Sequence, residues 1–208
     1  MNLSWTAPHH TSAVAARRLV FPPLTLAAAA LIAIACRSLD VDSIDLALRL
    51  QARLSFLLFV AALVGPAWQA LAPSRAASWL ACERAQLFQS FAISHTVHGI
   101  WVLLYFRLTP AVFGWSPADV SGLLAFPCIA LLGLLETSWG QQFVTAVVAR
   151  RARLALVAYA WVQFVGFFVD RLHGGRPELK AWYATAIAVS ILALLLAGLG
   201  ALRARAAD

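Results

Sequence analysis

Six long apolar runs, separated by segments that carry nearly all of the charged residues, dominate this chain of 208 residues. An α-helix rises about 1.5 Å per residue, so about 20 apolar residues cross a hydrocarbon core about 30 Å thick. The pattern therefore predicts an all-α polytopic membrane protein, a single bundle of six transmembrane helices. The predicted spans cover residues 19–36, 54–74, 85–106, 120–135, 154–169 and 181–202. Residues 1–18 and 203–208 are predicted to form the two tails.

The segments between the runs are predicted to be loops, and two of them are long. Residues 37–53 hold three aspartates at one membrane surface, and residues 137–153 end in a cluster of arginines. Within the second run, Gly65-Pro66 predicts a kink, because proline cannot donate to the helical hydrogen-bond ladder. The first run follows Arg17-Arg18 and imitates a secretory signal, but five further apolar runs favour a retained first helix.

Composition supports a membrane protein and argues against a nucleic-acid binder. The chain is 62% hydrophobic and 12% charged, against about 25% charged in an average soluble domain. The net charge of +7 comes from basic residues in short segments between apolar runs, so they indicate topology within a lipid bilayer. The three cysteines, Cys36, Cys82 and Cys128, are far apart and are predicted to be small buried hydrophobic residues.

An even number of spans places both termini on one side of the membrane. Of the sixteen Lys and Arg residues, nine fall on that side and seven on the other. The positive-inside rule therefore predicts cytoplasmic termini, as in a multi-pass protein of a bacterial inner membrane. The nine are Arg17, Arg18, Arg75, Arg84, Arg150, Arg151, Arg153, Arg203 and Arg205.

The third run contains the candidate site of the chain, a pair of histidines. His95 lies about 15 Å into a core about 30 Å thick, and His98 follows within one turn. Gln86, Ser90, Ser94 and His98 recur every four residues, so this polar stripe is predicted to face other helices or water. Two interpretations remain open. The histidines either hydrogen-bond to a neighbouring helix as neutral groups, or they form a cofactor, metal or proton site.

Aromatic residues near the ends of the runs are predicted to lie at the two membrane interfaces, where an amphipathic ring is best solvated. These residues are Trp79, Trp101, Tyr105, Trp115, Trp139, Trp182 and Tyr183.

Three stretches resemble the ferric-reductase-like transmembrane domain, a six-helix membrane module that binds b-type haem. ERAQLFQSFAISH, from Glu83 to His95, is similar to the family's entry into its third helix, and His95 falls on a haem-ligand position. Glu136-Thr137-Ser138 resembles the end of its fourth helix, and ARRARLALVAYAW, from Ala149 to Trp161, resembles the entry into its fifth. The resemblance implies haem b bound between helices three and five, with His95 pointing toward Arg153–Trp161.

The chain departs from the family at the other ligand positions. The position matching the first ligand of helix five is Arg153, and neither 166–168 nor Leu108-Thr109 supplies a histidine. His98 cannot oppose His95 across one iron, because residues three apart on a helix point the same way. Haem would then be five-coordinate through His95 or take an unusual sixth ligand. The same geometry also suits a small metal ion held by His95 and His98.

Two functions of different class follow. One is an electron-transfer membrane subunit that binds haem b through His95 and works with a separate redox protein, since no nucleotide-binding motif is present. The other is a haem-free membrane scaffold or assembly subunit descended from the same fold. A small-solute or proton transporter is a third reading, and whether the chain is an enzyme stays open. Large side chains such as Phe91, Tyr159 and Trp161 would exclude haem if they filled the space beside His95.

Overall fold

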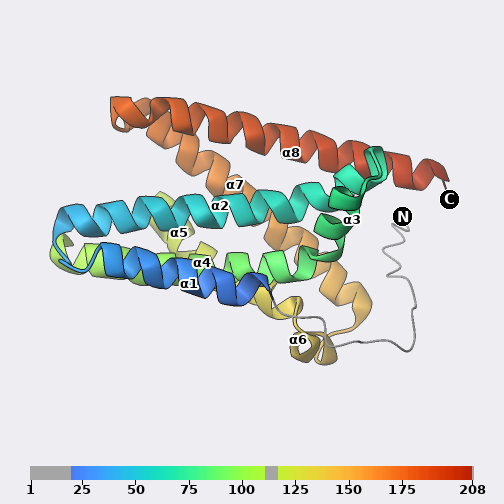
Figure 1. The fold of residues 1–208 in the computed structure, drawn as a ribbon, viewed down its shortest axis with the longest axis horizontal. Coiled ribbons are helices and arrows are strands. Elements are labelled where there is room, and N and C mark those ends of the chain that lie inside the picture. Colours follow the sequence, from blue (N-terminus) through green and yellow to red (C-terminus); the bar gives the residue numbers. More distant parts are fainter. Residues whose placement is uncertain (1–19, 111–116, 208) are drawn as a thin grey trace.

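The computed structural model describes residues 20–110 and 117–207, and all regular structure in these ranges is helical (Figure 1). The all-α prediction is confirmed. The elements are α1 (Phe21–Ala35), α2 (Val41–Leu71), α3 (Arg75–Cys82), α4 (Arg84–Leu108), α5 (Pro117–Leu135), α6 (Ser138–Gln142), α7 (Ala146–Gly174), η2 (Pro177–Leu179) and α8 (Lys180–Ala207).

Four helical segments are long and apolar enough to cross a membrane: Val41–Leu71, Arg84–Leu108, Ala146–Gly174 and Pro177–Arg203. The other two predicted spans coincide with shorter apolar helices. α1 has 15 residues, which correspond to about 22 Å of helix, less than a hydrocarbon core of about 30 Å. The apolar part of α5, Asp119–Leu135, also falls in this shorter class. By length and composition, four helices of the described residues can cross a membrane, and the other two predicted spans are not shown to do so.

The prediction of a loop over residues 37–53 is wrong from Val41 onward, because α2 begins there. Asp40 caps the helix, since its carboxylate accepts a hydrogen bond of 2.7 Å from the backbone N–H of Ser43. That bond and those from Ser43 and Ser38 hydroxyls hold the pKa of Asp40 below its ordinary value. Asp45 pairs with Arg49 one turn later at 3.2 Å. The acidic residues that suggested a loop thus start and stabilise a helix.

The second predicted loop, over residues 137–153, is also largely helical. Thr137 caps the short α6 through a 2.9 Å bond from the backbone N–H of Gly140, and Thr145 caps α7 in the same way. The arginine cluster therefore lies on the first turns of α7 rather than in a loop. α7 also runs on to Gly174, so His173, predicted to lie in a turn, belongs to its last turn.

Contacts between helix termini define two ends of the bundle. At the first, called here the Glu136 end, the backbone N–H of Val20 donates to Gln86 Oε1 at 2.9 Å, and Arg203 Nη1 donates to the carbonyl of Leu71 at 3.3 Å. This end holds the starts of α1, α4 and α7 and the ends of α2, α5 and α8. The opposite end is called the Asp45 end, where Arg176, just after α7, pairs with Asp45 near the start of α2 at 2.9 Å.

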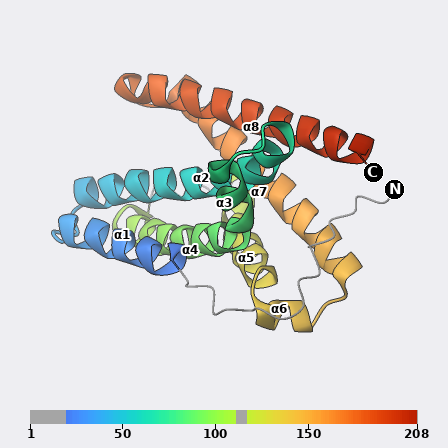
Figure 2. The same cartoon turned by 45° about the vertical axis from the view of Figure 1, so that its right-hand side comes forward.

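The helices form a layered bundle with α2 near its centre. α1 and α4 lie along one side of α2 and α8 along the other, while α7 runs obliquely from the start of α8 toward α6 (Figures 1 and 2). Buried aromatic residues of α2, α4 and α7 form the core between them, including Phe56, Phe59, Phe91 and Phe164. α4 and α5 meet closely at Gly133, where an added Cβ would overlap the Cβ of Ala92.

Candidate functional site

The two histidines lie side by side on α4 with ring centroids 5.5 Å apart. The Nδ1 atom of each is buried and has no hydrogen-bond partner. His98 also lies against the backbone of Leu48 on α2. Because buried polar atoms in folded proteins are nearly always hydrogen-bonded, two neighbouring unpartnered nitrogens indicate a site completed by water, an ion or a ligand.

Both histidines line a cleft of about 590 Å³ formed by α4, α5 and α7, with Ala52 contributed by α2. Across from His95, the cleft wall on α7 begins at Ala160 and ends at Arg171. His95 was predicted to face Arg153–Trp161. In the structure it faces a stretch of α7 that begins further along the helix, at Ala160. Tyr159 and Trp161 do not line the cleft, because Tyr159 donates to the carbonyl of Ser121 at 2.7 Å and Trp161 to that of Ser190 at 3.1 Å.

Aromatic rings enclose the His95 imidazole inside the bundle. Phe126 of α5 stacks on it with centroids 4.9 Å apart, while Phe91 and Phe164 lie 5.7 and 6.1 Å away. Phe126 also approaches His98 at 6.1 Å. These ring contacts hold both imidazoles in place by packing, and the backbone of Leu48 adds a hydrogen bond to His98.

Polar side chains that sequence reasoning did not assign to the site also line the cleft. Gln163 of α7 donates to the Ser121 hydroxyl of α5 at 2.7 Å, which joins the two walls. Asp119, Asp170 and Arg171 lie nearer the Asp45 end, and the guanidinium of Arg171 stands 5.2 Å from the ring of Phe167. The signal for Gln163 was its isolated polarity within an apolar run.

The predicted polar stripe of α4 faces other helices, as expected, but most of it lies outside the cleft. Ser90 and Ser94 are fully buried. Gln51 of α2 donates to both the carbonyl and the hydroxyl of Ser94, at 3.0 and 2.9 Å, and the hydroxyls of Ser55 and Ser94 are 2.8 Å apart. Ser94 of the stripe thus joins α4 to α2, and His98 is the stripe residue that lines the cleft.

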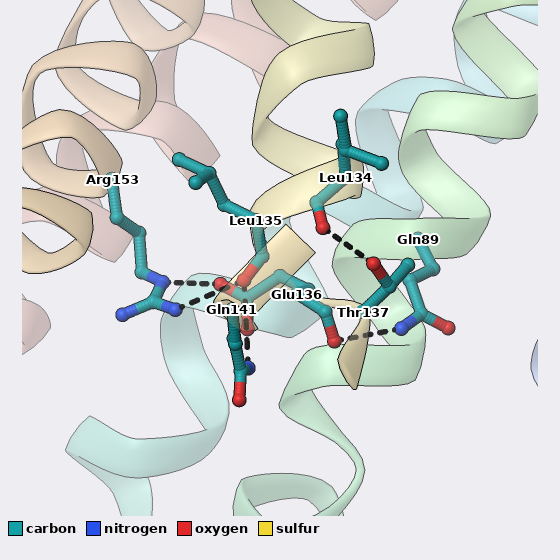
Figure 3. Close-up of polar contacts among 7 residues, drawn as sticks. All are labelled: Gln89, Leu134, Leu135, Glu136, Thr137, Gln141 and Arg153. Carbon is teal, nitrogen blue, oxygen red and sulfur yellow. Dashed lines mark hydrogen bonds and ion pairs between the residues drawn. The ribbon is translucent and has the colours of Figure 1, made fainter. Parts of the chain in front are cut away.

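A second polar cluster lies at the Glu136 end, where Arg153 forms an ion pair with the buried carboxylate of Glu136 (Figure 3). Gln89 of α4 donates to the carbonyl of Glu136 at 2.8 Å, and Arg84 lies close enough to be attracted to its carboxylate. The three stretches that resemble the haem family therefore converge here. Arg153 precedes the cleft-lining Ala160 by seven residues, about 10 Å of helix, so it neutralises Glu136 instead of facing His95.

Trp101 and Tyr183 are buried rather than at a surface, and Cys82 and Cys128 are not fully buried, contrary to prediction. Trp101 is 6% exposed and packs among α1, α2 and α4 instead of reaching a surface. Trp79 and Trp139 are exposed near helix ends, whereas Trp115 lies outside the described residues. Of the cysteines, Cys36 is buried, but Cys82 is exposed, so the prediction of a buried residue is wrong there.

Within residues 20–110 and 117–207, no group of three or more His, Cys, Asp or Glu side chains is placed to hold a metal ion. His9 and His10 lie outside the described residues. Comparisons with protein-family models, curated proteins and solved structures give no match for this chain. The site is thus defined by its geometry alone.

Proposed function

We propose that the chain is a multi-pass membrane protein in which six helices cross the bilayer and both termini are cytoplasmic. Four helices of sufficient length and hydropathy support this proposal, together with the alternation of helix direction between the two ends of the bundle. The short helices α1 and α5 cross by local thinning of the bilayer, which costs a fraction of a kcal/mol per Å of mismatch. The arginine bias of the termini fits a bacterial inner membrane.

Within this membrane protein, the cleft is the proposed binding site of a b-type haem, and the chain serves as an electron-transfer subunit. The observation that carries the proposal is a pair of imidazoles, each with a buried Nδ1 that has no hydrogen-bond partner, lining an aromatic-walled cleft of about 590 Å³. When bound, haem supplies one-electron redox chemistry that no side chain of this site offers. His95 would supply a nitrogen ligand to the haem iron, since it falls on the ligand position of the family that the sequence resembles and lies against Phe164 of α7.

Among the side chains that line the cleft, His95 would supply one ligand to the haem iron, and the wall opposite it offers no second one. The α7 wall opposite His95 offers Ala160, Gln163, Phe164, Gly166 and Phe167, none with an imidazole, thiolate or thioether. His98 shares the side of α4 with His95, so it stabilises the bound group from the same face. Arg171 lines the cleft and is the cation that would pair with an acidic substituent of the bound group. Electrons must come from a separate redox protein, because the chain has no nucleotide-binding motif.

A haem-free membrane scaffold is the second candidate, and one observation favours it. Phe126 stacks directly on the His95 ring, as expected where a histidine is only a packed core residue. Arg153, at a family ligand position, is committed to Glu136. In this case the cleft has no cofactor, and the convergence of α4, α5 and α7 serves assembly with another membrane protein.

An absorbance scan of the detergent-purified protein separates the two candidates. Haem binding predicts a Soret band that His95→Ala abolishes and His98→Ala weakens or shifts. Thr96→Ala, at an exposed position of the same helix turn, is the matched control and should leave the band unchanged. Equal loss in both histidine variants would indicate a shared metal site instead. The absence of any Soret band in protein expressed with excess haem would refute the cytochrome proposal and favour the scaffold.

A further inference from the structure

The cleft occupies only one half of the bundle. It follows α4 from His95 to Phe106 and α7 from Ala160 to Arg171, about 16 Å of helix in each case. Both stretches run from the middle of the bundle toward the Asp45 end. The cleft therefore extends from the histidines toward the Asp45 end of the bundle.

Polarity increases along the cleft in the same direction. Ser121 and Gln163 come first after the histidines, and the charged residues Asp119, Asp170 and Arg171 come last. Asp170 and Arg171 are exposed. Charged side chains in a membrane protein line water or pair with one another, because placing them in hydrocarbon is costly. This end of the cleft is accordingly suited to water rather than to lipid.

The other half of the bundle is closed below the histidines. Phe59 and Phe91 pack against Phe164, which forms the inner end of the cleft wall; each is no more than 8% exposed, and the ring centroids are 5.1 to 5.9 Å apart. Leu132 of α5 is fully buried beside them, and the Glu136–Arg153 ion pair lies beyond. Interiors packed in this way leave few voids larger than a water molecule. A hydrophilic molecule has no comparable route to His95 from the Glu136 end.

We propose that the cleft is a water-filled half-channel that admits small hydrophilic solutes to His95 and His98 from the Asp45 face of the membrane and from that face alone. The inference rests on the proposed membrane insertion but not on haem. It means that water, protons and small polar reactants exchange with the histidines on the side opposite the chain termini. Any chemistry at this site is then sensitive to solution conditions on that side.

Cysteines placed at three glycines can test this proposal without disturbing the packing, because an added Cβ at Gly122, Gly166 or Gly198 meets nothing within 4 Å. Gly122 and Gly166 line the cleft, whereas Gly198 lies on α8 outside it. Each is changed to cysteine in a chain lacking Cys36, Cys82 and Cys128. Ser38→Cys, exposed in the α1–α2 connection, marks the Asp45 face, and Leu132→Cys probes the closed half. Sealed vesicles of both orientations are treated with a membrane-impermeant sulfonated maleimide.

We expect Gly122→Cys and Gly166→Cys to react only in vesicles where Ser38→Cys reacts, and at least ten times faster than Gly198→Cys and Leu132→Cys. All thiols should react after denaturation in detergent, which confirms that each is present. The experiment is repeated with His95→Ala, so that a bound cofactor cannot mask the cleft.

Reaction of Gly166→Cys from both faces, or from neither, would overturn the half-channel. Reaction with a lipid-soluble maleimide alone would also overturn it and would show a lateral entrance from the bilayer. Because labelling does not depend on absorbance, a missing Soret band refutes the haem proposal and leaves this result standing.

Discussion

The ion pair between Glu136 and Arg153 gives the most direct test of how α5 and α7 are held together. The Glu136 side chain is 6% exposed and that of Arg153 is 22% exposed. Removing one partner of a buried ion pair costs about 3–5 kcal/mol, because the other charge stays buried without compensation. Since Arg153 keeps some contact with solvent, we expect Glu136→Gln to lower the free energy of unfolding by about 2–3 kcal/mol.

Arg153→Gln should cost less than Glu136→Gln. Arg84 lies near enough to attract the Glu136 carboxylate after Arg153 is removed, so we expect a loss of about 1–2 kcal/mol. In the double variant the Glu136–Arg153 pair is removed as a whole, so neither of its two charges is left without the other, and the two losses should not add. The coupling energy from the double-mutant cycle is expected to be about 1–2 kcal/mol.

The measurement is equilibrium unfolding of the purified protein in mixed micelles, followed by far-UV circular dichroism and tryptophan fluorescence. Arg151→Gln, at an exposed position of the same helix, is the matched control and should stay within about 0.5 kcal/mol of the parent. If the two single losses add to within about 0.5 kcal/mol in the double variant, the residues are not energetically coupled and the reasoning is refuted.

Two further predictions concern helix packing. Gly133→Leu should force α4 and α5 apart and lower the free energy of unfolding by about 1–3 kcal/mol, because even a Cβ there overlaps the Cβ of Ala92. Gly198→Leu, with open space at its Cβ, is the control and should be close to neutral. Equal effects of the two variants would contradict the α4–α5 contact. Ser94→Ala removes the hydroxyl that Gln51 and Ser55 share and should cost about 1–2 kcal/mol. Thr96→Ala, whose hydroxyl bonds only within α4, is the control for Ser94→Ala, and a loss as large there would argue against the buried network.

The helices themselves could be predicted because the signal for them is local. Each of the six apolar runs coincides with a helix, since long apolar stretches form helices whatever their neighbours are. The helix ends were predicted less well. The three aspartates of residues 37–53 suggested a loop, yet Asp40 caps α2 and Asp45 pairs with Arg49 inside it. Charge marks a surface, but only the backbone hydrogen bonds show whether that surface is helical.

The candidate site could be predicted in part for the same reason. His95 and His98 stood out as titratable residues within one apolar run, and their shared side of α4 follows from helical periodicity. Their surroundings depend on residues of other helices. Phe126 of α5 and Gln163 of α7 line the cleft together with the histidines of α4, and this depends on how the three helices pack.

Tertiary structure alone decided how the polar residues are paired. Gln51 lay in a predicted loop, yet it bonds to Ser94 inside the bundle, 43 residues away. Arg153 was predicted from a sequence resemblance to fall on a haem-ligand position, but the axial register of α7 against α5 places it beside Glu136. The sequence determined which segments are helical and apolar, because hydrophobicity is a property of each residue. Which polar residues pair with one another depends on how each whole helix is rotated and shifted along its axis relative to its neighbours. Only the packing of the complete bundle sets this.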